Sequence, residues 1–375
     1  MTLIEKWLNE SIFTESLSPA CKLCSQGTKM VVMITGLCPA SCYYCPLSLK
    51  KGGKDLIFAD EWELKDEQNT DILIKEAKLI NAKGAGITGG DPLSVPLRTL
   101  NYIKFLKDNF GESFHIHLYT SGLENKEIIS KLASSGLDEI RFHPMPNNWH
   151  NMDRSPIHKV IQNALKTEMD VAIEIPVIPN MEKEIVHLIN WADKQQIRWI
   201  NLNELEFSER NEIQLQKKEF IEKSDISAAA QYSQNTAYKI IESIAKSNLD
   251  IGVHYCSASF KDGVQLKNRI LRRAKNIATP IEVITDDATI LKGIIQTKNK
   301  TQLNTLIKEL IKTYDLSKQE YFINLKLYQL QIPIPLLEMV AEDLQKQGMV
   351  CYISEQYPTH DQLEVERIPL PMKNQ

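Results

Sequence analysis

Three closely spaced cysteines are the residues with the clearest chemical potential in this chain. The stretch LCPASCYYCP, residues 37–46, places Cys38, Cys42 and Cys45 in the spacing C-x3-C-x2-C. Four thiolates in paired C-x2-C spacing would complete a structural zinc site, whereas three leave one coordination position open on the metal that they hold. A [4Fe-4S] cluster fits this pattern, with three irons bound by cysteine and the fourth iron open to another ligand. A zinc site completed by a distant ligand and a coincidental grouping of thiols are the alternatives.

Four further potential metal ligands stand in two pairs. CKLC (residues 21–24) contributes Cys21 and Cys24, and HYC (residues 254–256) contributes His254 and Cys256. C-x2-C is a common ligand spacing, and His-x-Cys within a strand directs both side chains to one face. If the four residues converge, they form a Cys3His site, for which we expect structural zinc ahead of an auxiliary cluster. A redox-active C-x2-C pair and free packed cysteines are the alternatives.

The composition is that of a soluble protein with an apolar core. The chain has 375 residues, a net charge of −4 and 43% apolar residues, so it has no general attraction to nucleic acid. No stretch approaches the roughly 18 uninterrupted apolar residues of a membrane span. The first residues, MTLIEKWLNESIF, lack the basic flank and apolar block of a secretory signal. We therefore expect a cytoplasmic location, where grouped cysteines indicate metal binding rather than disulfides. The isolated Cys351 is expected to be a small buried hydrophobe.

Alternating strand and helix patterns must position these residues. The apolar strand-like runs are residues 29–36, 84–88, 114–120, 138–144, 170–179, 198–205 and 250–256, and amphipathic helical patterns cover residues 69–83, 96–110, 125–136 and 182–194. Short strands separated by helices of this length favour parallel pairing through right-handed crossovers, hence an α/β barrel or open barrel. Chemistry in such barrels is located at the carboxyl ends of the strands. The three-cysteine stretch directly follows the first strand.

Four segments are expected along the chain. Residues 1–27 form an N-terminal arm with the CxxC pair, residues 28–256 the barrel, residues 257–277 a basic connecting helix, and residues 278–375 a compact α+β domain. A helix is also expected around residues 227–246, because SAAAQYSQNTAYKIIESIAK has a helical pattern.

With its cysteines and its order of elements, the chain resembles the radical S-adenosylmethionine (SAM) superfamily. The motif C-x3-C-x-aromatic-C of that family, after the first strand of a partial (β/α)6 TIM-like barrel, is matched by Cys38, Cys42, Tyr44 and Cys45. The resemblance covers residues 28–256. It implies that the amino and carboxylate groups of SAM chelate the fourth iron. It also implies that an electron from a donor such as ferredoxin or flavodoxin cleaves SAM to methionine and a 5′-deoxyadenosyl radical, which abstracts hydrogen from a substrate.

The resemblance implies further cofactor contacts at the strand ends. ITGGDP (residues 87–92) is similar to the family's G-G-E-P, whose exposed carbonyls receive the methionine amino group, although a plain turn is the alternative. The residues implied at the cofactor are Gly89, Gly90, Asp91, Pro92, Ser121, Arg141, His143, Val177, Asn203 and Glu204. The run IEIPVIPN looks like the fifth-strand region of glycyl-radical-enzyme activases, with Asn180 in place of a glycine.

A basic run follows the HYC motif. KDGVQLKNRILRRAK, residues 261–275, carries Lys261, Lys267, Arg269, Arg272, Arg273 and Lys275 against the single acid Asp262. It is either a solvated helix face or a patch that meets phosphate on RNA, a lipid headgroup or a nucleotide-like substrate.

The HYCS…KD…QL…R pattern and the ending EQYPTHDQLEVERIPLP together resemble an archaeal group related to pyruvate formate-lyase activating enzyme. That resemblance spans nearly the whole chain and implies fold and cofactor but no substrate. The sequence therefore predicts a radical SAM enzyme. An RNA-modifying enzyme, a glycyl-radical-enzyme activase and a non-catalytic iron-sulfur protein are its alternatives.

Overall fold

The computed structural model describes residues 2–370, and the chain divides into two compact units, residues 1–266 and 267–375. None of the helices described between residues 2 and 370 combines the length and apolar character that a bilayer crossing needs.

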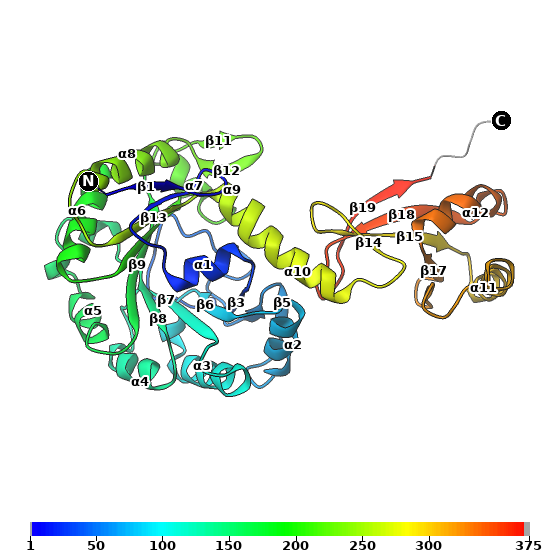
Figure 1. Cartoon of the computed structure of the whole chain (residues 1–375), viewed down its shortest axis with the longest axis horizontal. Helices are drawn as coiled ribbons and strands as arrows, with labels where there is room; N and C mark the ends of the chain where they lie inside the picture. The colour runs from blue at the N-terminus through cyan, green and yellow to red at the C-terminus, as the bar shows by residue number, and fades with distance from the viewer. Residues whose placement is uncertain (1, 371–375) are drawn as a thin grey trace. The chain divides into compact units, whose positions relative to one another are not determined.

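The first unit is an open parallel barrel. Its parallel strands, in spatial order, are β13 (Gly252–Cys256), β10 (Trp199–Glu204), β9 (Asp170–Val177), β8 (Glu139–Phe142), β7 (His115–Thr120), β6 (Gly84–Gly89) and β3 (Lys29–Thr35). The predicted barrel is confirmed, and β13 adds a seventh parallel strand to the six of the family pattern. Figure 1 shows the covering helices outside the ring of strands: α2 (Asp71–Leu79), α3 (Pro96–Phe110), α4 (Ile129–Ser134), α5 (His158–Ala164), α6 (Glu182–Lys194) and α8 (Ser233–Ala245).

Two antiparallel hairpins cover the edges of this sheet. β4 (Ile57–Ala59) and β5 (Trp62–Leu64) extend it beyond β3, while β2 (Ile12–Thr14) and β1 (Ile4–Lys6) extend it beyond β13. The N-terminal segment thus contributes two strands to the sheet. The sheet does not close on itself: β1 forms one of its edges and β5 forms the other.

The short helix α1 (Pro19–Ser25) lies inside the ring of strands (Figure 1). It contacts β3, β6, β7 and the π-helical turn η5 (Lys261–Leu266). Strand side chains alternate between faces. The face toward the outer helices is therefore apolar, with Ile116, Leu118 and Phe142 fully buried, whereas the face toward α1 carries polar groups such as His117 and Arg141. We call this space inside the barrel the lumen.

An insertion separates β10 from α8. It contains α7 (Glu212–Gln216), β11 (Glu222–Ser224) and β12 (Ser227–Ala230). The helix predicted around residues 227–246 is therefore wrong in its first part. Tyr232 adopts a left-handed backbone with φ 70°, which a continuous helix cannot include, so α8 starts only at Ser233.

The second unit is α+β, as predicted. It begins with α10 (Lys267–Ile277), followed by an antiparallel sheet in the order β16 (Phe322–Asn324), β17 (Gln329–Ile332), β15 (Ile290–Gln296), β18 (Val350–Gln356) and β19 (Glu364–Pro369), with β14 (Val283–Ile284) also paired to β15. Helices α11 (Lys300–Tyr314) and α12 (Ile334–Lys346) supply Leu303, Leu306 and Leu337 to its core. Cys351 is buried in that core, as expected of a small hydrophobe. The basic helix belongs to this unit, since the division falls after Leu266 rather than near residue 278.

Candidate cofactor site

The cysteine stretch forms a loop whose base is pinched at Gly36. The Gly36 amide donates to the Lys54 carbonyl, and the Gly53 amide donates to the Gly36 carbonyl, both at 2.8 Å. A Cβ atom on Gly36 would lie 2.0 Å from the Lys51 carbonyl oxygen. Glycine is therefore required there, and the intervening residues form a closed loop at the carboxyl end of β3.

An ion pair from α3 fixes the same end of β3. Arg98 contacts Asp55 at 2.7 Å and also donates to the Ile34 carbonyl, while Asp55 accepts from the Thr35 hydroxyl at 2.8 Å. The hydrogen bonds from Arg98 hold the pKa of Asp55 below its ordinary value. The loop therefore leaves the sheet from a rigid point.

The three thiols of the loop are free and accessible to different degrees. Cys38 is exposed, and Cys42 and Cys45 are half-buried. Partial desolvation by the surrounding loop raises the pKa of Cys38 to about 11, so metal binding there must release a proton. Among residues 2–370, no three His, Cys, Asp or Glu side chains lie together as a metal-binding group. The donor set of three neighbouring thiols nevertheless has the chemistry that an iron-sulfur cluster requires.

Tyr44 anchors this loop to the rest of the barrel. Its hydroxyl lies 2.9 Å from His143 Nε2, and His143 Nδ1 lies 2.7 Å from the Glu174 carbonyl oxygen. Because a carbonyl only accepts, Nδ1 carries the proton and Nε2 accepts from Tyr44. Burial raises the pKa of Tyr44 and lowers that of His143, so this pair is neutral. Asn211 of the insertion donates to the Tyr44 carbonyl at 3.1 Å.

Gly89 and Gly90 bring the end of β6 against the cysteine loop. The Gly90 amide donates to the Thr35 carbonyl at 2.8 Å, and the Asp91 amide donates to the Leu37 carbonyl at 2.7 Å. A Cβ atom on either glycine would lie 2.1 Å from one of these two carbonyl oxygens, and Gly89 has a φ of 137°. The glycines are required for this close approach between two backbone segments.

Asp91 and Ser121 are engaged with each other. The buried Asp91 carboxylate accepts from the Leu93 amide, the Thr120 hydroxyl, and both the amide and hydroxyl of Ser121. Pro92 is buried and starts the 3-10 turn η1 (Pro92–Ser94). The carboxylate therefore ties the ends of β6 and β7 together.

Arg141 is held by partners from the barrel strands and from the start of α1. Its guanidinium contacts Glu139 and Glu174 at 2.6 Å each and donates to the Ser18 hydroxyl at 2.7 Å. All three guanidinium nitrogens are thus occupied inside the lumen, and a contact of Arg141 with SAM stays a prediction. Asn203 belongs to the same network, since its amide donates to Glu174 at 2.8 Å.

Three other residues of the sequence prediction are found at the ends of their strands. Val177 is buried, and its carbonyl accepts from the Ser233 hydroxyl at 2.8 Å. Glu204 accepts from the Ala258 amide at 2.8 Å. Asn180 has a φ of 68°, so it adopts the left-handed conformation for which glycine is usually selected.

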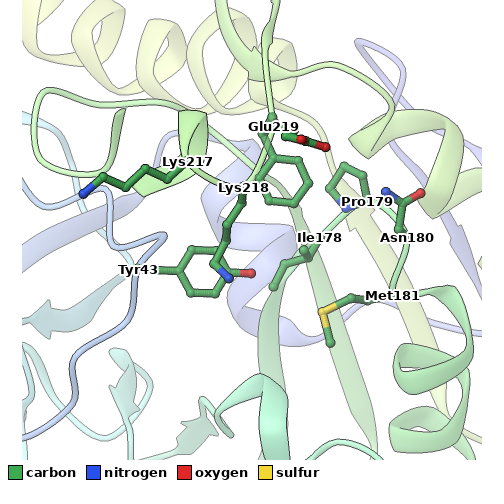
Figure 2. A pocket seen from close by; sticks show the side chains of 9 residues that line it. Tyr43, Ile178, Pro179, Asn180, Met181, Lys217, Lys218 and Glu219 are labelled. Carbon is green, nitrogen blue, oxygen red and sulfur yellow. The ribbon is translucent and has the colours of Figure 1, made fainter. Parts of the chain in front are cut away.

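A hollow of about 410 Å³ opens beside the cysteine loop. It is lined by Tyr43, by the turn of residues 178–181 after β9, and by residues 217–220 of the insertion. Figure 2 shows Lys218 directed toward Tyr43, and the Lys218 ammonium lies 4.5 Å from the ring centroid. Sequence reasoning missed Lys217, Lys218 and Phe220, because nothing in the insertion's sequence marks it as part of a site.

The second cysteine group faces the lumen. Cys21 and Cys24 lie on α1, and His254 and Cys256 lie on β13. Burial raises the pKa of Cys24 to about 11, and burial together with the nearby Arg141 charge lowers the pKa of His254 to about 3.

The basic run is used in part for internal contacts. Lys261 forms an ion pair with Glu206 at 2.6 Å, and Lys267 lies 3.5 Å from Asp287. Arg273 is buried and donates to the Pro358 carbonyl. This segment is therefore not a fully solvated helix face, and phosphate binding by it stays a prediction.

An open parallel barrel with a three-cysteine loop after its first strand defines an iron-sulfur enzyme of the radical SAM type. The model named "Radical SAM superfamily" matches residues 32–192. A protein of Methanocaldococcus jannaschii named "Putative glycyl-radical enzyme activating enzyme" is 42% identical over 379 residues, which cover 99% of this chain and 96% of that one. The chain therefore belongs to the radical SAM superfamily, and it is a radical SAM enzyme. The family implies a [4Fe-4S] cluster and SAM.

Two other kinds of similarity were found. A model named "Domain of unknown function (DUF8061)" matches residues 288–370, within the second unit. Streptococcus suis SuiB bound to S-adenosylmethionine has a TM-score of 0.43 and 10% identity, covering 61% of this chain and 50% of that one. Methylornithine synthase has a TM-score of 0.39 and 10% identity, covering 60% and 70%. The chain thus spans half the length of SuiB, and such low TM-scores add nothing to the family assignment.

Proposed function

We propose that Cys38, Cys42 and Cys45 hold three irons of the cluster and leave the fourth iron to SAM. The observation that carries this proposal is the placement of three free thiols on one pinched loop, directly against the Gly89–Gly90 turn. When bound, the reduced cluster supplies the electron that cleaves SAM to methionine and a 5′-deoxyadenosyl radical.

The protein's own residues shape the space around this centre. The Asp91 carboxylate holds the ends of β6 and β7 in place, and His143 fixes the Tyr44 ring through its neutral tautomer. The hollow beside Tyr43 and the turn of residues 178–181 receives the adenosyl end of SAM, because it combines an aromatic ring with apolar walls next to the loop. Asn203 does not line this hollow, and its amide donates to Glu174 instead.

The substrate class that we favour is a glycine in a partner protein. The name of the M. jannaschii relative is the support for this choice. Activation would remove one hydrogen atom from the glycine Cα and leave a glycyl radical on the partner. The electron for the cluster comes from a small carrier such as ferredoxin or flavodoxin. The RNA-modifying alternative is not favoured, because Lys261, Lys267 and Arg273 are engaged within the chain.

The cluster assignment is tested by Cys42→Ala with Cys351→Ala as the matched control. Both changes remove one thiol, but Cys351 lies in the core of the second unit. After anaerobic reconstitution with iron and sulfide, Cys42→Ala is expected to lose 5′-deoxyadenosine production while the circular dichroism spectrum stays unchanged. The control retains production. Wild-type amounts of 5′-deoxyadenosine from folded Cys42→Ala would overturn the assignment.

The partner assignment needs a separate readout. The reduced protein is incubated with SAM and with each glycyl-radical enzyme of its own organism, and electron paramagnetic resonance is recorded. The expected result is the signal of a glycyl radical in one partner. Active SAM cleavage with no glycyl signal in any partner would refute the activase while leaving the cluster assignment intact.

A further inference from the structure

Two pairs of metal-ligand side chains, more than two hundred residues apart, face the lumen. Cys21 and Cys24 are three residues apart on α1, a spacing that places both on one face of a helix. His254 and Cys256 are two residues apart on β13, so they project from the same face of the sheet. The radical SAM site uses none of the four.

A series of contacts connects the two pairs through the lumen. Cys21 Sγ lies 3.4 Å from Arg141 Nη2, and Arg141 contacts Glu174, whose carboxylate accepts from Asn203. Asn203 is the register partner of Cys256 on the neighbouring strand. Cys256 Sγ lies 3.6 Å from the Gln265 amide on η5, which in turn contacts α1. These contacts place the elements that carry the two pairs around the same part of the lumen.

His254 is a buried polar residue whose ring nitrogens lack a partner in this space. Its side chain is 4% exposed, yet neither ring nitrogen has a hydrogen-bond partner. Its ring neighbours are Trp7 and Phe260, with centroids 5.5 and 6.3 Å away. An unsatisfied buried polar group is destabilising, so native proteins rarely keep one without a purpose. A buried neutral imidazole readily donates a ring-nitrogen lone pair to a metal ion.

The charges around the space favour a centre rich in thiolate. Three thiolates and one neutral imidazole around a divalent ion carry a net charge of −1. One buried cation stands close by, Arg141 beside Cys21. Glu139 and Glu174 balance Arg141, so the site is not so positive that it would repel a metal ion.

We propose that Cys21, Cys24, His254 and Cys256 bind a zinc ion that joins α1 to the last parallel strand of the barrel. Within residues 2–370 the four do not yet form a metal-binding group, and the same holds for the cysteine loop. Binding therefore draws the two pairs together, and the energy of metal coordination stabilises the N-terminal arm inside the lumen. The π-helical geometry of η5 beside Cys256 is typical of functional positions in helices.

The test uses the full chain with the cluster loop disabled by Cys38→Ala, Cys42→Ala and Cys45→Ala, so that only the lumen site can hold metal. After expression with zinc and iron and removal of loose metal by chelation, elemental analysis is expected to give about one zinc per chain. Adding Cys21→Ser and Cys256→Ser should remove this zinc, whereas adding Cys351→Ser should not. Cobalt(II) in place of zinc should give the absorption of a tetrahedral thiolate site, and the same two serines should abolish it.

A second measurement covers the case in which the serine variants do not fold. His254→Gln keeps a buried polar side chain, and the expected result is weaker zinc retention with an unchanged circular dichroism spectrum. A strong chelator should lower the melting temperature of the parent chain but not that of the variants that lack zinc. The proposal would be overturned if the parent protein contained no zinc and its melting temperature did not change when zinc was added. Iron in place of zinc at the same residues would overturn the zinc assignment. Both results are independent of SAM cleavage.

Discussion

At the scale of single residues, Asp91 shows how a predicted cofactor contact can be a structural one. Its carboxylate is fully buried and accepts four hydrogen bonds from the ends of β6 and β7. Asp91→Asn turns part of this acceptor into a donor that faces other donors. Because one unsatisfied buried group costs about 1 to 3 kcal/mol, we expect a loss of about 2 kcal/mol in the free energy of unfolding and weaker SAM binding.

Urea unfolding and calorimetric titration with SAM check this prediction. Asp225→Asn is the control, since Asp225 is exposed in the insertion, and surface changes of this kind usually stay within about 0.5 kcal/mol. Equal stability of the two variants would show that the Asp91 contacts contribute little.

Lys29 makes the stability of the folded chain depend on pH. Burial lowers its pKa from 10.5 to about 7, and its ammonium lies 2.9 Å from His115 Nδ1. Between these two pKa values the unfolded chain binds more protons than the folded chain, so Lys29 makes stability rise with pH. The slope is at most about 1.4 kcal/mol per pH unit.

The measurement compares wild type with Lys29→Met by urea unfolding at several pH values from 7 to 9. Wild type should gain stability relative to Lys29→Met as the pH rises, because the cost of burying a charged ammonium disappears. The exposed Lys183→Met serves as the control and should show a constant difference from wild type. If the stability difference between wild type and Lys29→Met also stayed constant with pH, this result would contradict the lowered pKa of Lys29.

At the scale of elements, the sequence predicts the strands and helices whose apolar residues recur at a regular spacing. The seven parallel strands and helices α2, α3 and α6 lie within a few residues of their expected positions, because apolar spacing of two or three to four residues is visible locally. The position of α1 could not be predicted. It has seven residues, begins with a proline, and is held by Arg141, which lies 123 residues from Ser18. The contacts of Arg141 with Ser18 and Cys21 were hidden for the same reason.

Ser18 therefore controls how α1 sits in the lumen. Its hydroxyl accepts from the Cys21 amide at 3.1 Å and from Arg141 at 2.7 Å. Ser18→Ala removes a helix cap, which costs about 1 kcal/mol, and leaves a buried guanidinium donor without its acceptor.

We expect Ser18→Ala to lower the free energy of unfolding by about 2 to 4 kcal/mol and to speed amide exchange in α1. Ser25→Ala changes the other end of the same helix, where the hydroxyl is close to solvent, and should have a much smaller effect. Similar values for the two variants would mean that the arm is held by other contacts.

At the scale of the whole molecule, each unit has an apolar core of its own. The core of the first unit includes residues from Ile12 to Tyr255, and that of the second from Ile295 to Cys351. All residues of the proposed cluster and SAM site belong to the first unit. The sequence predicted a second domain from its change of texture, with residues 257–277 as a connecting helix, and the two compact units divide within that segment, after Leu266.

A fragment of residues 1–266 is therefore expected to fold and to cleave SAM within about threefold of the full chain, a difference of less than 1 kcal/mol in the activation free energy. Circular dichroism and the amount of 5′-deoxyadenosine measure this. An unfolded fragment would show that the barrel depends on residues 267–375, and a folded but inactive fragment would show that the second unit completes the site.

The central claim is that the chain leaves one iron of its cluster without a cysteine ligand. Electron paramagnetic resonance of the anaerobically reconstituted and reduced protein, recorded with and without SAM, tests it most directly. We predict a [4Fe-4S] signal that changes when SAM is added, followed by the formation of 5′-deoxyadenosine. A cluster whose spectrum is identical with and without SAM, and which yields no 5′-deoxyadenosine, would contradict the account.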